Sequence, residues 1–142
     1  IIDRYFARYA GVKRWLGEIV AQARQAGEVR TVFGRVRPMP EISARNPALR
    51  QGAERTAINT PIQGTAADLV KLSMLRVHAA LAREALDARL LLQVHDELVV
   101  EAAERAVEPV AALLKREMEA VEGLSVPLLV EVGQGRSWAE AH

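Results

Sequence analysis

The sequence predicts an α+β fold for its 142 residues, on the basis of two features of its hydrophobic pattern. Long segments place apolar residues three or four positions apart, which is the spacing of an amphipathic helix. Between them, short apolar runs bounded by glycine or polar residues come in pairs, which is typical of antiparallel hairpins. Half of the residues are hydrophobic, so a chain of this length can build a core.

The chain is expected to begin with two helices. Residues 1 to 9 have the pattern of the end of a helix, and Gly11 interrupts it. A second helix is expected over residues 12–26, with Gly27 at its C-cap.

A short hairpin with a glycine turn is predicted next, over residues 28–37. Its residues alternate between apolar and polar until Gly34 breaks the run. Arg30, Arg35 and Arg37 cluster in this hairpin. Arginines so placed can face phosphate groups, and a solvated hairpin explains the same spacing equally well.

A proline-marked loop over residues 38–47 is followed by a long helical segment, from 49 to 86. Pro61 lies inside this segment. One interpretation starts a new helix there, with Thr60 as N-cap and Gln63 as its capping-box partner. The other continues a single helix with a kink at the proline.

The rest of the chain is expected to form a second hairpin, a helix and a last strand. Residues 89–94 and 98–101 are short apolar runs joined by three residues, which predicts a tight antiparallel hairpin. A helical pattern covers residues 104–121. An apolar run over residues 126–132 predicts the last strand.

Composition excludes several classes of protein. There is no uncharged apolar stretch near the length of about 18 residues that spans a bilayer, and no charged segment leads into an apolar one as in a secretion signal. Without cysteine there are no disulfides or thiolate metal sites, and a cytoplasmic protein is expected. The net charge of +1 selects no partner by itself. Because the chain opens at Ile1 inside an amphipathic pattern, it is expected to be a fragment or a processed product.

The charged tripeptide His95-Asp96-Glu97 lies at the tip of the second predicted hairpin. A hairpin tip on a rigid sheet is a good place to present ligands. Adjacent carboxylates without thiolates favour a hard cation such as Mg²⁺. A polar turn that merely stays in water explains the same string, and the tripeptide alone does not decide between them.

A polar stripe is predicted on the long helix. Arg55, Asn59 and Gln63 are four residues apart, so a continuous helix places them on one face. Their donor groups suit the edges of bases in nucleic acids. A solvated helix face is the alternative.

Both features lie inside longer segments that resemble signature segments of bacterial family A DNA polymerases. These are ERTAINTPIQGTAAD at residues 54–68 and LQVHDELV at residues 92–99, in the family's order and at about its separation. TVFGR at residues 31–35 resembles the family's fingers hairpin. VPLLVEVG at residues 126–133, with Trp138, resembles its last strand and C-terminus. The resemblance covers nearly the whole chain.

The resemblance implies part of a fingers and palm polymerase domain, with an antiparallel palm hairpin packed with long helices. Residues 1–48 are expected to belong to the fingers and residues 49–142 to the palm. The implied activity is template-directed transfer of deoxynucleotides to a primer 3′-hydroxyl, in DNA replication or repair. The implied partners are primer-template DNA, deoxynucleoside triphosphates and two Mg²⁺ ions. A monomeric enzyme with no membrane partner is expected.

The resemblance also implies roles for single residues. Asp96 is similar to a catalytic carboxylate that binds magnesium, Glu97 to a supporting catalytic carboxylate and His95 to a contact with the primer terminus. Arg55, Asn59 and Gln63 are similar to residues that touch the minor groove near the primer end. There, acceptors occur on every base pair, so that reading them gives no sequence preference.

The family's second metal-binding aspartate and its triphosphate-binding helix have no counterpart in this sequence. The chain alone is therefore expected to be inactive. Val36 also separates Arg35 from Arg37, where the family often has three consecutive basic residues. Two other functions are weighed: a DNA-binding module without catalysis, which would not need Asp96, and a metal-dependent nuclease, which would need further carboxylates nearby.

Overall fold

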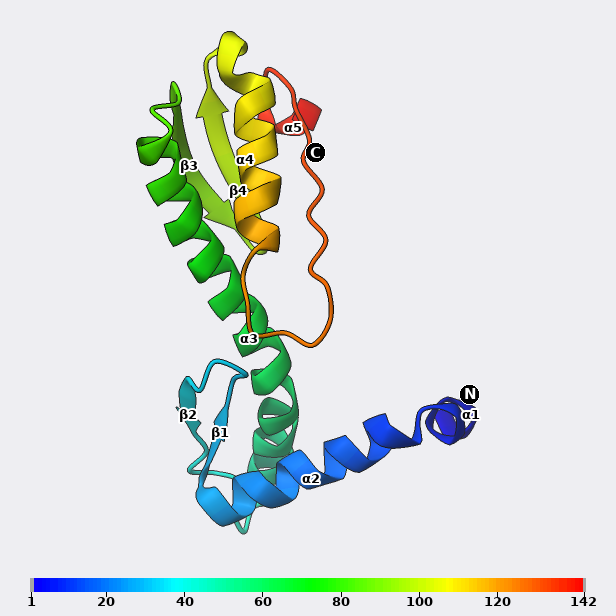
Figure 1. Cartoon of the computed structure of the whole chain (residues 1–142). Coiled ribbons are helices and arrows are strands. Elements are labelled where there is room, and N and C mark those ends of the chain that lie inside the picture. The colour runs from blue at the N-terminus through cyan, green and yellow to red at the C-terminus, as the bar shows by residue number, and fades with distance from the viewer. Residues whose placement is uncertain (1, 142) are drawn as a thin grey trace. The chain divides into compact units, whose positions relative to one another are not determined.

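The computed structural model describes residues 2–141 as two compact units, one ending at Thr65 and the other starting at Ala66 (Figure 1). Each unit contains helix and one antiparallel hairpin, so the predicted α+β class is confirmed. The long helix α3 (Pro47–Arg83) contributes residues to both. Within residues 2–141, no helix is both long and apolar enough to cross a membrane.

Two helices open the first unit, α1 (Ile2–Arg8) and α2 (Ala10–Ala26). The break between them falls at Tyr9, where the backbone is not helical (φ −117°, ψ 59°), and Gly11 lies inside α2. The predicted break at Gly11 is therefore wrong by two residues. A glycine in a helix costs about 1 kcal/mol but does not end it. Gly27 ends α2 as predicted, in the left-handed conformation (φ 70°).

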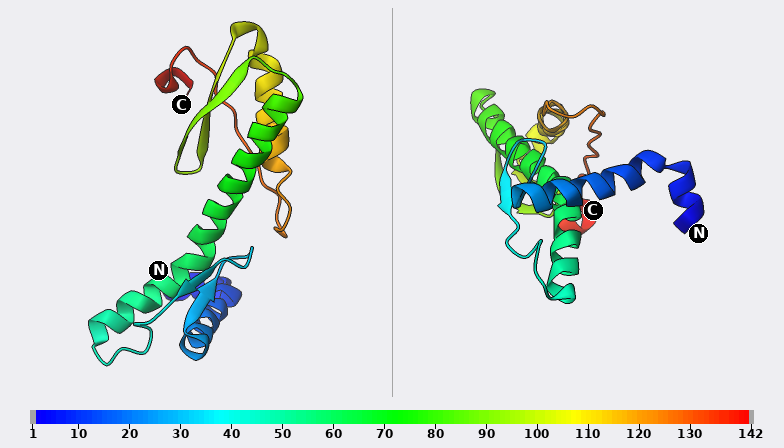
Figure 2. Two further views of the ribbon diagram at one scale, coloured as in Figure 1. Left: turned by 90° about the vertical axis from the view of Figure 1, so that its left-hand side faces the viewer. Right: turned by 90° about the horizontal axis from the view of Figure 1, so that it is seen from below.

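The predicted first hairpin is confirmed. Strand β1 (Glu28–Arg30) pairs antiparallel with β2 (Val36–Pro38), and Gly34 supplies a positive φ of 82° in the connection. The hairpin lies beside the first part of α3 (Figure 2). The core of this unit is formed by side chains of α2, β1, α3 and the loop after β2: Ala23, Val29, Met39, Ile42, Ala53 and Ala57.

Helix α3 begins earlier than predicted and does not stop at its proline. Asn46 caps it, since its Oδ1 accepts a hydrogen bond of 2.9 Å from the amide of Ala48, and Pro47 takes the first helical position. The helix continues through Pro61 to Arg83. Of the two interpretations of Pro61, the single continuous helix is therefore correct.

The second unit packs helices on one face of a hairpin. Strands β3 (Ala88–Val94) and β4 (Glu97–Ala102) pair antiparallel with an irregularity at Leu91. A short 3-10 turn η1 (Glu104–Ala106) leads into α4 (Val107–Glu119), which lies with the last part of α3 on the same face of the hairpin (Figure 2). The buried core joins these elements: Val77, Ala80, Leu81, Ala106, Val110 and Leu113.

The predicted last strand over residues 126–132 is wrong. The described segment after α4 has no strand or helix until α5 (Trp138–Ala141). Its sequence has strand preference, but a strand also needs a neighbour for its backbone groups. Here the amide of Val130 donates instead to the carboxylate of Glu119 at 2.9 Å, and Leu129 is 84% exposed.

Candidate nucleic-acid and metal interface

The tip of the β3–β4 hairpin is a two-residue turn. Val94 and Glu97 are the last paired residues, so that only His95 and Asp96 lie between the strands. The predicted three-residue connection is therefore wrong by one residue, because Glu97 begins β4. Both turn residues are exposed and Glu97 is half-buried.

The backbone of this turn fixes how the side chains are presented. His95 has a positive φ of 52°, which is uncommon for a residue with a Cβ atom. The side-chain amide of Gln93 donates to the His95 carbonyl at 2.9 Å and supports the turn. Asp96 and Glu97 therefore lie at the end of two paired strands, which give a ligand group a rigid support.

Asp96 and Glu97 are hard oxygen donors, which suit Mg²⁺. Mg²⁺ is usually held by one or two carboxylates together with water and substrate phosphates. Within residues 2–141, no group of three or more histidine or carboxylate side chains lies close enough to hold a metal ion. Asp96 and Glu97 are of a chemical type that could supply part of the ligands of a magnesium ion, and their assignment to such a site stays a prediction.

The polar stripe is exposed on α3, in the first unit. Arg55, Asn59 and Gln63 are all solvent-exposed, as a surface that reads a ligand requires. Asn59 and Gln63 line a cavity of about 400 Å³ between α3 and the β1–β2 hairpin. The hairpin side of this cavity includes Arg35 and Arg37.

Three lining residues of this cavity on α3 were not predicted from the sequence to belong to the site. Thr56, Thr60 and Gly64 each follow one member of the polar stripe by a single position. They are themselves four residues apart, so they form the neighbouring column on the helix. That repeated spacing is the signal that identifies them.

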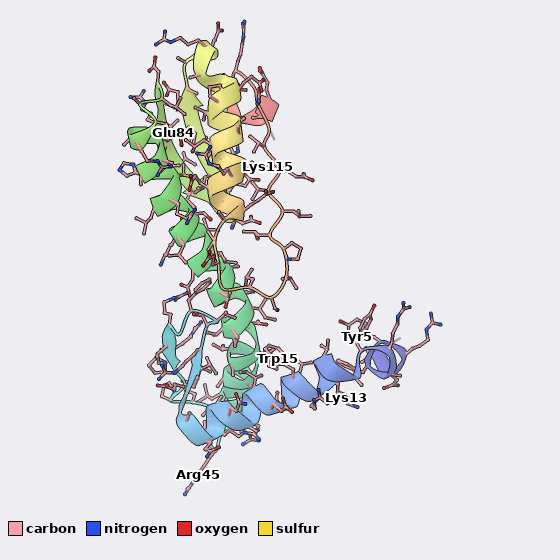
Figure 3. The ribbon with its side chains drawn as sticks, viewed as in Figure 1. Tyr5, Lys13, Trp15, Arg45, Glu84 and Lys115 are labelled. Atoms are coloured by element: carbon pink, nitrogen blue, oxygen red, sulfur yellow. The ribbon has the colours of Figure 1, made fainter. Side chains whose placement is uncertain are left out.

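Glu117 is a buried carboxylate in the second unit that several arginines surround. The side chain of Glu117 is only 9% exposed and accepts from Arg76 at 3.1 Å and from Arg83 and Arg116 at 3.3 Å. Arg116 also donates to Glu84 at 2.6 Å. Glu84 directly follows the end of α3 (Figure 3). Burial raises the pKa of the Glu117 carboxyl, but the three arginines together outweigh burial and hold it below its ordinary value.

Comparison with known proteins points to one family. Residues 1–140 match the model for DNA polymerase family A. The chain is 52% identical over 141 residues to DNA polymerase I of Pseudomonas aeruginosa, and 51% identical over 140 residues to the thermostable DNA polymerase I of Thermus thermophilus. These alignments cover 99% of this chain but only 15% and 17% of those proteins.

A solved structure is also similar. It is the POL domain of Pol1 from M. smegmatis in complex with DNA primer-template and dNTP, at a TM-score of 0.95 and 44% sequence identity. The match covers 99% of this chain and 25% of that chain.

Proposed function

Because the chain belongs to DNA polymerase family A, we propose that it is one part of a DNA-directed DNA polymerase that extends a primer on a template. The observation that carries this proposal is the match over residues 1–140, which includes both the exposed turn of β3–β4 and the exposed stripe on α3. Since the chain spans less than a fifth of its curated relatives, other segments of the complete polymerase are needed to finish the active site.

Asp96 is the proposed magnesium ligand and principal catalytic carboxylate, and Glu97 is its supporting partner. Two Mg²⁺ ions, when bound, would stabilise the attacking and leaving oxygens of the transfer, the general role of metal pairs in polymerases. The contribution of this chain is to present the Asp96 carboxylate at the end of a paired hairpin. His95, next to it on the turn, would contact the primer terminus.

Arg55, Asn59 and Gln63 are the proposed contacts to the minor groove. Purine N3 and pyrimidine O2 accept hydrogen bonds there on every Watson–Crick pair, so donors on this stripe tolerate any sequence. A mispair moves these acceptors, and the same donors would then lose their hydrogen bonds. The stripe would therefore favour extension of correctly paired ends.

The proposal also assigns the subdomains, the substrates and the cellular location of the enzyme. Residues 1–48 would belong to the fingers and residues 49–142 to the palm, with α3 lying mostly in the palm. The substrates would be primer-template DNA and deoxynucleoside triphosphates, handled by a monomer in the bacterial cytoplasm during replication or repair. The structure of M. smegmatis Pol1 with primer-template and dNTP supports these substrates.

The test is the Asp96→Asn substitution in the complete polymerase. Asparagine keeps the size of the side chain but removes the charge that holds the metal, so we expect the single-turnover rate to fall about 100-fold or more. The dissociation constant for primer-template should stay within about threefold, since phosphate contacts elsewhere dominate it. The Glu97→Gln substitution should lower the single-turnover rate less than Asp96→Asn does.

Asp87→Asn is the matched control, because Asp87 is an exposed carboxylate in the same unit that pairs with Arg105, away from the turn. It should keep the wild-type rate. A wild-type rate for Asp96→Asn would exclude Asp96 as a principal ligand. It would favour a DNA-binding role without catalysis for this turn.

A further inference from the structure

The connection of the β1–β2 hairpin is fastened to one turn of α3 by two hydrogen bonds. The amide of Val32 donates to Thr65 Oγ1 at 3.0 Å, and Arg35 Nη2 donates to the carbonyl of Gly64 at 3.0 Å. Thr65 is 7% exposed, so its hydroxyl is largely shielded from water. A third, longer contact of 3.4 Å joins Arg37 and Thr60.

Gly64 lets the hairpin come this close. A Cβ atom added to Gly64 would lie 2.7 Å from Thr31 Cγ2, which is too short for two carbon atoms. Thr31 is buried, and its Oγ1 accepts a hydrogen bond of 3.1 Å from the amide of Arg35. The hairpin is therefore held against α3 by close packing at Gly64 as well as by hydrogen bonds.

The helical turn under the hairpin is the one that carries Gln63. Pro61 lies inside it, and a proline lacks the N–H that would bond to the carbonyl four residues earlier. The hydroxyl of Thr65 donates to the Pro61 carbonyl while it accepts from Val32. One hydroxyl thus links the hairpin to the turn that the proline weakens.

We propose that Thr65 and Arg35 are positioning residues, which hold the Gln63 turn so that its side chain meets the acceptor at the primer end. This inference rests on the proposed minor-groove role of Gln63. Both arginines of the pattern Arg35-Val36-Arg37 contact α3, at Gly64 and Thr60, although Val36 separates them in the sequence.

The test compares two primers in the complete polymerase, one ending in a normal purine and one whose terminal purine has carbon in place of N3. The single-turnover extension rate is measured for wild type and for Gln63→Ala, Thr65→Val and Arg35→Met. Removing N3 should slow wild type about threefold to tenfold, the effect of one hydrogen bond. Each variant should be slowed on the normal primer by a similar factor and little further by the loss of N3.

Two conservative variants serve as matched controls. Thr65→Ser keeps the hydroxyl and Arg35→Lys keeps a donor, so both should recover most of the rate and of its dependence on N3. The salt dependence of primer-template affinity separates positioning from direct contact. A phosphate contact by Arg35 would reduce the slope of log K against log salt by about 0.9 in Arg35→Met, whereas positioning leaves it unchanged.

If Thr65→Val and Arg35→Met each slow extension, relative to wild type, by the same factor on both primers, the inference is overturned. A reduced salt slope in Arg35→Met would also overturn it. If Gln63→Ala is itself slowed equally on both primers, the minor-groove role of Gln63 is wrong and the inference fails with it. Because Gln63→Ala leaves the hydrogen bonds of the hairpin intact, it distinguishes failure of the minor-groove role from failure of the positioning role. If Thr65→Val does not fold, the Arg35→Met and Arg35→Lys pair decides.

Discussion

Replacing Glu117 with glutamine should destabilise the second unit in a way that depends on pH. The Glu117 carboxylate is 9% exposed and bonds to Arg76, Arg83 and Arg116, whose side chains are 45–60% exposed. Water screens the arginines, so each pair contributes about 0.2–1 kcal/mol, near the range for exposed pairs. Losing all three should lower the free energy of unfolding by about 1–3 kcal/mol at pH 7.

The sign of the pH dependence follows from the lowered pKa of Glu117. In the unfolded chain, this carboxyl has its ordinary pKa of 4.5. Its contribution is therefore complete above pH 4.5 and is lost as the pH falls through the lower pKa of the folded state. The difference between wild type and Glu117→Gln should be constant from pH 7 to about 5. Below about pH 5, this difference in the free energy of unfolding should shrink.

Urea unfolding followed by the fluorescence of Trp138 measures this difference, in a Trp15→Phe background so that only the second unit reports. Glu101→Gln is the matched control, because its pair with Arg89 is exposed on both sides (72% and 56%). It should change the free energy of unfolding by no more than about 0.5 kcal/mol. If Glu117→Gln has an effect no larger than that of the control, or if the difference widens in acid, the three arginines do not stabilise the charged carboxylate of Glu117.

Two further predictions concern packing. Leu113→Ala should lower the free energy of unfolding of the second unit by about 2–5 kcal/mol in the same urea assay, because the side chain is fully buried; a loss below 1 kcal/mol would contradict its place in the core. Gly64→Ala should lower the thermal midpoint of the first unit, since the clash with Thr31 outweighs a gain in helix propensity of about 1 kcal/mol. Gly52→Ala, in the same helix with open space around it, should keep or raise that midpoint.

Local patterns predicted most of the helices and both hairpins, because their periods differ and glycine marks their ends. Local sequence patterns failed where the secondary structure depends on pairing with another segment of the chain. The apolar run at 126–132 has strand preference, but it finds no strand to pair with in the described part of the chain. Glu97 looked like a turn residue, yet the ladder register with Val94 makes it the first residue of β4.

In the candidate site, the exposure of the polar stripe could be predicted from the sequence, whereas the contacts around it could not. The i, i+4, i+8 spacing of Arg55, Asn59 and Gln63 was enough to predict an exposed stripe, since it follows from helix geometry alone. The seat of the hairpin on Gly64 and Thr65 was not predictable, because its contacts join residues about 30 positions apart. Glu117 was missed for a similar reason, since two of its three arginine partners, Arg76 and Arg83, lie more than 30 positions away on α3.

Asp96 on the β3–β4 turn is the residue that we propose to hold catalytic metal. The most direct measurement is a titration of the complete polymerase with Mn²⁺, followed by electron paramagnetic resonance. A dideoxy-terminated primer-template and a matching deoxynucleoside triphosphate hold the complex before the reaction. Wild type and the Asp87→Asn control should bind Mn²⁺ with the same stoichiometry and affinity. Asp96→Asn should lose at least one tightly bound ion, and an unchanged titration curve for this variant would contradict the account.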